Sequence, residues 1–303
     1  MDWMTITEGF LAAAVRVATP LLLAATGETI AQRSGVMNLG LEGVMLTGAL
    51  AAALGAGAWG PWTGAAVAVT AGMLLAGVFA LVAIAARADQ VIAGTAITLG
   101  AVGLTGTIYR QAFGAAGAGL DLPTLAPLAL PGLSKLPVVG PALFGQPAPT
   151  YLGLLAVPVA WWFLFRTRAG LALRATGEAA SVARASGVRT RVVRAAATVV
   201  GGGFAGLAGA SLVLAQVGTF AERMTAGRGY VAIAIVVLGR WHPVGVALAS
   251  LGFGAAMALQ FLFQTMGLDV PYQLFLMLPY ALALLALAGV VGRVRAPADL
   301  GKA

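Results

Sequence analysis

Polar side chains that could contact a solute interrupt an apolar stretch near the N-terminus: Glu28, Arg33, Asn38 and Glu42. An ionised side chain at the bilayer centre costs roughly 2.5–3.5 kcal/mol on insertion scales, so such residues usually face a protein interior or a water-filled path. These four could line or gate a path for a polar solute. The two glutamates could instead pair with Arg33 or cap helix ends, in a purely structural role.

The segment that holds these residues, 27–43, reads GETIAQRSGVMNLGLEG and is rich in glycine. Glycine lets the backbone unwind and lets helices approach closely, as a broken helix beside a translocation path requires. A second polar segment, 220–229, carries Glu222, Arg223 and Arg228 between two apolar runs. It is either an external loop or a re-entrant element that faces the same path.

Basic residues gather in two further regions. Seven arginines fall within Arg166–Arg194, and Arg293, Arg295 and Lys302 lie near the end of the chain. In the short loops of a membrane protein such clusters mark the cytoplasmic side, so both regions are predicted to be cytoplasmic. The net charge of +8 is therefore interpreted as a signal of membrane topology and not of nucleic-acid binding.

Within the basic loop 166–194, the sequence predicts a short amphipathic helix. Gly177 and Glu178 precede the small residues of 179–184, which favour one or two helical turns, and Gly187 ends them. A short helix of small residues with basic flanks suits docking in a groove of a soluble partner. A loop that merely fixes the topology is the alternative.

Residues that could support catalysis are scarce. Cysteine is absent, one histidine is present and the acids are scattered, so the chain offers no clear nucleophile, carboxylate pair or metal set. The lysines, Lys135 and Lys302, lie outside any Gly-rich phosphate loop, which excludes ATP hydrolysis by the P-loop route. We therefore expect no catalytic residue, metal or cofactor in this chain.

The elements that position these residues are predicted to be membrane-spanning helices. The 303 residues are 60% hydrophobic and 9% charged, whereas a soluble domain carries about a quarter charged residues. We expect one all-α transmembrane domain over residues 1–303, a polytopic helix bundle. Because a spanning helix needs about 20 apolar residues, spans are predicted near 10–25, 44–58, 63–86, 91–109, 152–165, 192–216, 229–239, 244–264 and 272–291.

The number of spans depends on the polar segment 27–43. If it is a short broken crossing, the chain has ten spans with both termini inside, which is the preferred interpretation. If it only dips in and out, eight spans and an outside N-terminus follow. The stretch 110–149 holds seven prolines and is predicted to be an ordered external cap, because these prolines would break a spanning helix.

Two pairs of short matches suggest an internal repeat. Ala31-Gln32-Arg33 is similar to Ala221-Glu222-Arg223, and Trp59-Gly60-Pro61 is similar to Trp241-His242-Pro243. Transporters are often built from repeats, with the binding path at the repeat interface. Short matches in an Ala- and Gly-rich chain also arise by chance, so the repeat is a hypothesis.

Four motifs in order resemble those of the permease subunits of bacterial nucleoside-type ABC importers, a branch of the sugar and branched-chain amino-acid permease group. They are GETIAQRSGVMNLGLEGVMLTGA, LRATGEAASVARASGV, MTAGRGYVAIAIVVLGRWHPVG and MLPYALALLAL. The resemblance covers most of the chain and is to the shorter of two permease paralogues.

The resemblance implies a function and a set of partners. ATP-driven closure of an ATPase subunit, commonly a fused double-domain chain, would push on a coupling helix and switch the permease between outward- and inward-facing forms. A second permease, a paralogue or an identical copy, would complete the pore, and an extracytoplasmic lipoprotein would deliver a nucleoside or a similar solute such as a sugar or flavin. The complex would lie in the bacterial plasma (inner) membrane. The residues that resemble the coupling helix are Gly177, Glu178, Ala180, Ala183, Arg184 and Gly187.

An ion-driven secondary transporter or channel is the alternative function. Buried acids such as Glu28 and Glu42 would then bind the coupling ions, and no docking loop would be required.

Overall fold

The computed structural model describes residues 3–114, 121–129, 131, 132, 134, 139–265, 277, 281, 284 and 295–302. Apart from an isolated bridge between Pro127 and Pro147, the regular structure in these ranges is helical, which confirms the predicted all-α fold for this part of the chain. The helices are α1 (Trp3–Arg33), α2 (Leu41–Trp59), α3 (Pro61–Ala80) with its π-helical extension η1 (Leu81–Ala85), α4 (Gln90–Phe113), α5 (Val139–Phe144), α6 (Ala148–Arg166), α7 (Arg168–Glu178), α8 (Ala180–Ala185), α9 (Thr190–Leu212) with its π-helical extension η3 (Val213–Val217), α10 (Arg228–Leu238) and α11 (Pro243–Thr265).

Seven helical segments of the described residues are long and apolar enough to cross a membrane. They are Ile6–Arg33, Leu41–Trp59, Pro61–Ala85, Gln90–Phe113, Ala148–Arg166, Thr190–Val217 and Pro243–Leu262. The predicted span at 272–291 lies outside the described residues, apart from isolated positions. The prediction of about ten spans is therefore not confirmed.

The first polar segment differs from the prediction. Residues 27–33 continue α1, so only 34–40 interrupts the helices, and 27–43 makes no crossing of its own. Gly27 serves close packing here and not unwinding, because a Cβ at this position would lie 2.5 Å from Cβ of Phe204 and 2.8 Å from the carbonyl oxygen of Gly201. The sequence showed the glycine but not the neighbouring helix that requires it.

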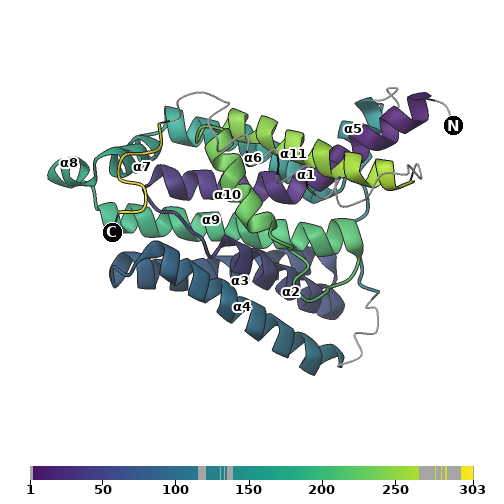
Figure 1. The fold of residues 1–303 in the computed structure, drawn as a ribbon, viewed down its shortest axis with the longest axis horizontal. Coiled ribbons are helices and arrows are strands. Elements are labelled where there is room, and N and C mark those ends of the chain that lie inside the picture. The colour runs from purple at the N-terminus through teal and green to yellow at the C-terminus, as the bar shows by residue number, and fades with distance from the viewer. Residues whose placement is uncertain are drawn as a thin grey trace.

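The start of α1 and residues 295–302 lie at opposite ends of the bundle (Figure 1). This arrangement differs from the preferred interpretation with both termini inside, and it agrees with the alternative of an outside N-terminus. The reason is again the unbroken α1, which removes the crossing at 27–43. The nine other predicted spans then remain, an odd number that places the termini on opposite sides, so the count of eight for this alternative is one too low.

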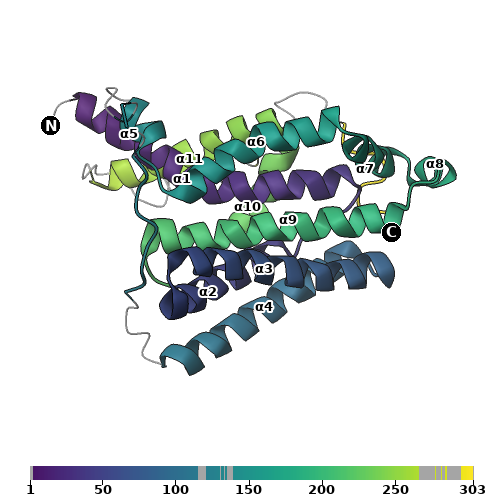
Figure 2. The ribbon, with the colours of Figure 1, turned by 180° about the vertical axis from the view of Figure 1, so that it is seen from behind.

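The spanning helices form three layers, with α6 and α11 on one side, α1 and α9 in the centre, and α2, α3 and α4 on the other side (Figures 1 and 2). Glycines of α9 permit this packing. A Cβ at Gly206 would meet the carbonyl oxygen of Ala68 in α3, and one at Gly209 would meet that of Met45 in α2. The backbone of α9 therefore touches the backbones of its neighbours directly.

Residues 121–129 cover the end of the bundle at which α2 and α9 end. Leu122 and Leu125 are buried, and their backbone N–H groups donate to the carbonyl oxygens of Gly218 at 3.0 Å and Leu214 at 2.8 Å. This strap lies at the end opposite α8 (Figure 2). That it is part of an external cap remains a prediction.

The proposed internal repeat is not confirmed. Ala31–Arg33 forms the last turn of α1, whereas 221–223 lies in a turn. The other pair agrees better, since Pro61 and Pro243 each begin a helix, as proline does readily at a first helical position.

Candidate functional site

Helix α10 is short and lies inside the bundle. Its 11 residues extend about 16 Å, roughly half the hydrocarbon thickness of a bilayer. Ala232, Ile235 and Val236 are fully buried in the core. The predicted span at 229–239 is therefore too short to cross by itself, and both of its ends lie among other helices.

Glu42 holds the start of α10. Its Oε1 accepts hydrogen bonds from Oγ1 of Thr225 at 2.6 Å and from the N–H of Gly227 at 2.8 Å, and its Oε2 accepts from the N–H of Gly229 at 2.7 Å. Glu42 itself lies in the first turn of α2. Two helix N-termini thus meet at one buried carboxylate, which their dipoles favour.

The other end of α10 is held by the last turns of α1. The indole N–H of Trp241, three residues after α10, donates to Oε1 of Gln32 at 2.7 Å, and Nε of Arg33 donates to the carbonyl oxygen of Trp241 at 2.8 Å. Gln32 in turn donates from Nε2 to Oε1 of Glu28 at 2.9 Å. The same Glu28 oxygen accepts from the N–H of Asn38 at 3.1 Å.

These bonds join the break between α1 and α2 to both ends of α10. We call this set the junction: Glu28, Gln32, Arg33, Asn38, Glu42, Thr225 and Trp241. Neither glutamate pairs with Arg33 in the described structure. Glu28 accepts a hydrogen bond from the N–H of Asn38 in the break, and Glu42 accepts from N–H groups at the start of α10, as in the structural interpretation. A role in translocation stays a prediction.

Sequence reasoning missed Gln32, Thr225 and Trp241 as members of the junction. The contact of Gln32 with Glu28 could have been predicted, since Gln32 lies one helical turn after Glu28 and on the same face of the helix. Trp241 was not, because 209 residues separate it from Gln32.

The second polar segment, 220–229, divides into two parts. Thr225 and Gly229 are buried against Glu42, as a re-entrant element would be. Glu222 and Arg223 are exposed, as in an external loop. Arg228 is partly buried and donates from Nη1 to the carbonyl oxygen of Met224 at 2.9 Å.

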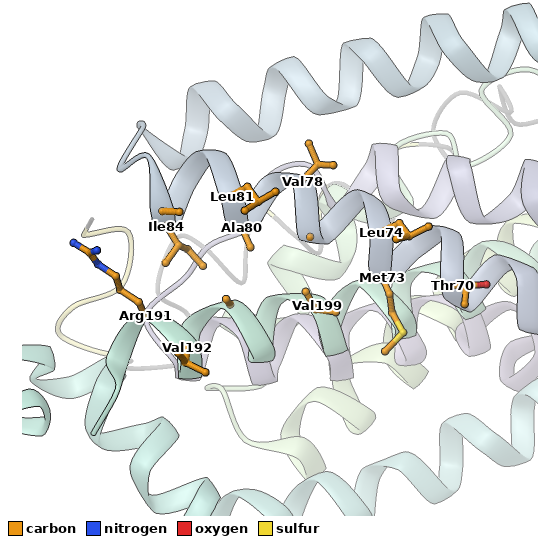
Figure 3. A pocket seen from close by; sticks show the side chains of 13 residues that line it. Thr70, Met73, Leu74, Val78, Ala80, Leu81, Ile84, Arg191, Val192 and Val199 are labelled. Atoms are coloured by element: carbon orange, nitrogen blue, oxygen red, sulfur yellow. The ribbon is translucent and has the colours of Figure 1, made fainter. Parts of the chain in front are cut away.

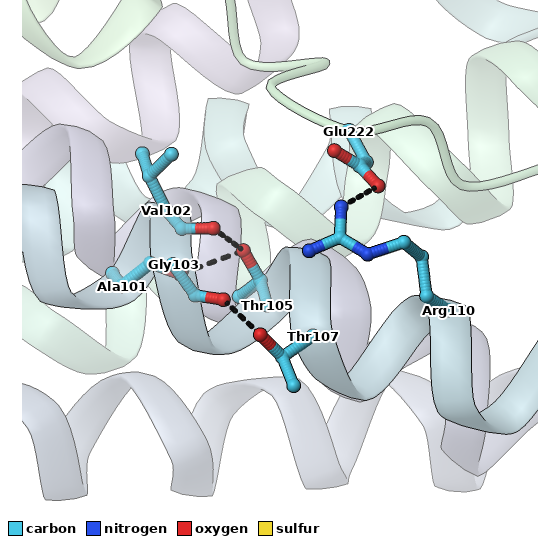
Figure 4. A network of polar contacts seen from close by, with 7 residues as sticks. All are labelled: Ala101, Val102, Gly103, Thr105, Thr107, Arg110 and Glu222. Atoms are coloured by element: carbon cyan, nitrogen blue, oxygen red, sulfur yellow. Dashed lines mark hydrogen bonds and ion pairs between the residues drawn. The ribbon is translucent and has the colours of Figure 1, made fainter. Parts of the chain in front are cut away.

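Glu222 pairs with Arg110 at the end of α4, 2.7 Å from Oε1 to Nη1, with both side chains about half exposed (Figure 4). The nearby hydroxyl groups of Thr105 and Thr107 donate to carbonyl oxygens of their own helix. Glu222 and Arg223 thus lie apart from the junction, and the structure does not bring them together with Glu28.

The predicted short helix in the basic loop is present as α8 and stands beyond the end of the bundle (Figure 1). The N–H groups of Gly187 and Val188 donate to the carbonyl oxygens of Arg184 and Ala183, both at 3.0 Å, and Gly187 has a φ of +85°. This pattern is a Schellman motif, in which glycine takes the left-handed position. The prediction that Gly187 ends the helix is confirmed.

The six coupling candidates occupy different environments. Gly177 is buried against the end of α1, where a Cβ would meet the carbonyl oxygen of Arg33. Ala183 is buried and Ala180 is partly buried, whereas Glu178, Arg184 and Gly187 are exposed. Of the six, only these last three are free to meet a partner.

Residues 297–302, which we call the tail, tie α8 to the bundle. The N–H of Asp299 donates to the carbonyl oxygen of Gly177 at 2.9 Å, and the N–H of Gly301 donates to that of Gly35 at 3.0 Å. Arg194 of α9 donates from Nη1 to the carbonyl oxygen of Lys302 at 2.9 Å and from Nε to that of Ser34 at 3.2 Å. The loop, α1, α9 and the tail therefore meet at one place.

A ring cluster connects the same loop to the turn before α11. Phe165 lies under the guanidinium groups of Arg174, at 4.9 Å, and Arg33, at 5.9 Å, and its ring centroid is 5.2 Å from that of His242. Burial, and then the positive charge of Arg33, hold the pKa of His242 below its ordinary value. Arg33, a member of the junction, thus shares the Phe165 ring with Arg174 of the loop.

The comparisons with known proteins identify the family. Residues 10–287 match the family model described as "Branched-chain amino acid transport system / permease component". The chain belongs to this permease family. No solved structure matches the permease significantly.

The permease has curated relatives over most of its length. It is 35% identical over 309 residues to the guanosine ABC transporter permease protein NupQ of Bacillus subtilis. The alignment covers 98% of this chain and 96% of NupQ. It is 32% identical over 289 residues to the nucleoside ABC transporter permease protein NupC of Lactococcus lactis, covering 92% and 91% of the two chains. It is 40% identical over 270 residues to TsgC13 of Haloferax volcanii, a permease protein named for a glucose ABC transporter, covering 88% and 80%.

The family, the relatives and the seven apolar helices agree. The permease is a multi-pass protein of the plasma membrane and the membrane-spanning subunit of an ABC importer. Its family is one of permease components and not of enzymes.

Proposed function

We propose that the permease forms half of a translocation path for nucleosides. The observation that carries this proposal is the similarity to NupQ and NupC, whose names state guanosine and nucleoside transport and whose lengths the chain covers almost completely. A sugar is the competing substrate, since TsgC13 is named for glucose. A nucleoside contains a sugar, so the two substrate classes share hydroxyl chemistry.

The exposed side of α8 is proposed to receive the ATPase subunit. Glu178 and Arg184 are exposed there, and Val182 is 64% exposed. A small apolar residue between opposite charges suits a groove of a folded partner. Gly177, Ala180 and Ala183 face inward and would transmit the force of docking to α1 and the tail.

The route of this force is proposed to run from α8 to α10. Movement of α8 would act on Gly177 and thus on the end of α1, where Arg33 and Gln32 hold the turn at Trp241. Displacing that turn would move α10 against Glu42 at its other end. Through the junction, ATP binding to the cytoplasmic ATPase subunit would then change the shape of the translocation path in the core.

Two further partners complete the proposal. A second permease, a paralogue or an identical copy, would close the path from the other side. An extracytoplasmic lipoprotein would deliver substrate at the end of the bundle opposite α8, near the 121–129 strap. The ATPase is proposed to be a separate chain with two ATP-binding domains.

Reconstituted transport tests the function. The permease, its paralogue, the ATPase and the lipoprotein would be placed in vesicles, and uptake of labelled guanosine, uridine, riboflavin and glucose would be compared with and without ATP. We expect ATP-dependent uptake of the nucleosides. Uptake driven by an ion gradient without ATP would support a secondary transporter, and uptake of glucose alone would assign a sugar.

A further inference from the structure

An apolar groove with a volume of about 930 Å³ runs between α3 and α9 (Figure 3). Side chains of Met73, Leu74, Val78, Leu81 and Val199 line it. Leu74 and Leu81 are 73% and 66% exposed, as side chains that face lipid are. Both helices belong to predicted membrane spans, so the groove lies at the depth of hydrocarbon.

A basic pocket of about 400 Å³ adjoins one end of this groove, and Ile84 and Arg191 line both cavities. Figure 3 shows Arg191 at that end of the row of apolar side chains. Among the described residues that line the pocket, Asp299 is the one carboxylate. The cationic residues that line the pocket are Arg87, Arg184, Arg191, Arg194 and Lys302.

Three of the five cations have no partner among the described residues. Arg194 binds two backbone carbonyl oxygens, and Lys302 lies 3.2 Å from Asp299. Arg87, Arg184 and Arg191 are exposed, and the described part of the chain gives them neither a hydrogen bond nor an ion pair. Guanidinium groups bind phosphate with paired hydrogen bonds, so the pocket is suited to a phosphate group.

The position of the pocket indicates which phosphate-containing molecule binds there. It adjoins α8 and the arginine-rich loop, the side that the positive-inside rule assigns to the cytoplasm. The cytoplasmic leaflet carries anionic lipids, and basic pockets between spanning helices on that side bind their head groups. The adjoining groove offers room for an acyl chain.

We propose that the α3–α9 groove and the basic pocket together bind an anionic phospholipid. The head-group phosphate lies among Arg87, Arg184 and Arg191, and one acyl chain lies along Leu74, Val78 and Val199. An apolar face of a second permease would fill the groove alone, whereas a phospholipid offers both an acyl chain for the groove and an anion for the three arginines. The charge of the pocket therefore favours lipid as the occupant.

Native mass spectrometry of the purified, delipidated permease tests the proposal. The probes are phosphatidylglycerol, phosphatidylcholine with the same acyl chains, and glycerol phosphate. We expect phosphatidylglycerol to bind roughly tenfold more tightly than phosphatidylcholine, because three cations face the head group. Equal binding of the two lipids would overturn the proposal.

Paired variants separate the basic pocket from general surface charge. Arg87→Gln with Arg191→Gln should weaken binding of phosphatidylglycerol about tenfold. Arg168→Gln with Arg295→Gln removes the same charge from exposed residues of the same side that do not line the pocket. This control pair should bind like the unmodified permease, and equal weakening in both pairs would contradict a specific site.

The groove is tested by Gly77→Phe. A Cβ at Gly77 meets only Cγ2 of Val199, at 3.9 Å, so the ring would enter the groove and should exclude phosphatidylglycerol while sparing glycerol phosphate. Should this variant fail to fold, lysophosphatidylglycerols of increasing chain length test the same point on the unmodified permease, with affinity expected to rise with length.

Two outcomes would assign another occupant. Glycerol phosphate that binds as tightly as the lipid would indicate a plain phosphate site. Phosphatidylglycerol that is displaced when the two permeases assemble would identify the groove as the contact between them. Either result would overturn the lipid site.

Discussion

Oδ2 of Asp299 accepts a 2.7 Å hydrogen bond from the backbone N–H of Ala180, the first residue of α8. The two residues are 119 positions apart. Together with the bond from the N–H of Asp299 to the carbonyl oxygen of Gly177, this contact joins the end of the chain to both sides of the α7–α8 corner. The tail thus determines how firmly α8 is held against the bundle.

Asp299→Ala should loosen α8. A hydrogen bond to a charged group contributes about 1.5–3 kcal/mol, so we expect a lower melting temperature and less substrate carried per ATP hydrolysed. Lys302→Gln is the matched control, because it removes only an ion pair whose lysine is 67% exposed, and such pairs contribute about 0–1 kcal/mol. Equal effects of the two changes would refute the role of Asp299.

The same contact should depend on pH. The hydrogen bond from Ala180 holds the pKa of Asp299 below its ordinary value. A carboxylate with a depressed pKa stabilises the folded state above its unfolded pKa of about 4, and loses this contribution as pH falls through the folded pKa. The difference in melting temperature between the unmodified permease and Asp299→Asn should therefore be constant from pH 7 to 5 and shrink below about pH 4. A constant difference at all pH values would contradict this prediction.

Glu42→Gln should destabilise the start of α10. An amide has one acceptor oxygen, so it cannot receive the bonds that both oxygens of Glu42 accept, and a buried group left unsatisfied costs about 1–3 kcal/mol. The melting temperature and the rate of nucleoside uptake should both fall. Glu222→Gln provides the comparison, since its exposed pair with Arg110 should contribute less than about 1 kcal/mol. Normal uptake by Glu42→Gln would show that transport does not require Glu42.

Trp241→Phe should weaken the other end of α10. The change removes the indole N–H and leaves Oε1 of Gln32 without this donor in a buried site, at a cost of about 1–3 kcal/mol. Trp59→Phe is the control, because Trp59 is 73% exposed. Hydrogen exchange of 228–238 should rise only in the Trp241 variant, and unchanged exchange would exclude the proposed link.

Glu178→Lys combined with Arg184→Glu should separate ATP hydrolysis from transport. Both side chains are exposed, and the described residues give them no hydrogen bond or ion pair, so expression and melting temperature should stay normal. ATP hydrolysis by the complex should continue while uptake per ATP falls. Arg168→Glu, on the same loop but outside α8, controls for charge alone. Normal coupling in the double variant would place the ATPase contact elsewhere.

The class of fold and the position of α8 follow from local sequence. Apolar content over 20 or so residues is a local property, and it suffices to predict spanning helices. The helix before Gly187 was predictable for the same reason, because a left-handed glycine acts on its own turn.

The long-range contacts of the polar residues depend on the assembled bundle. Glu28 finds its partners Gln32 and Asn38 nearby in the sequence. The partners of Glu42 are instead 183 to 187 positions away, and they reach it only through the packing of the helices in the bundle. The same packing keeps Gly27 helical and so changes the number of crossings. The link from Asp299 to Ala180 joins segments more than a hundred residues apart, and no local propensity encodes such a pair, because its geometry exists only once the helices are assembled.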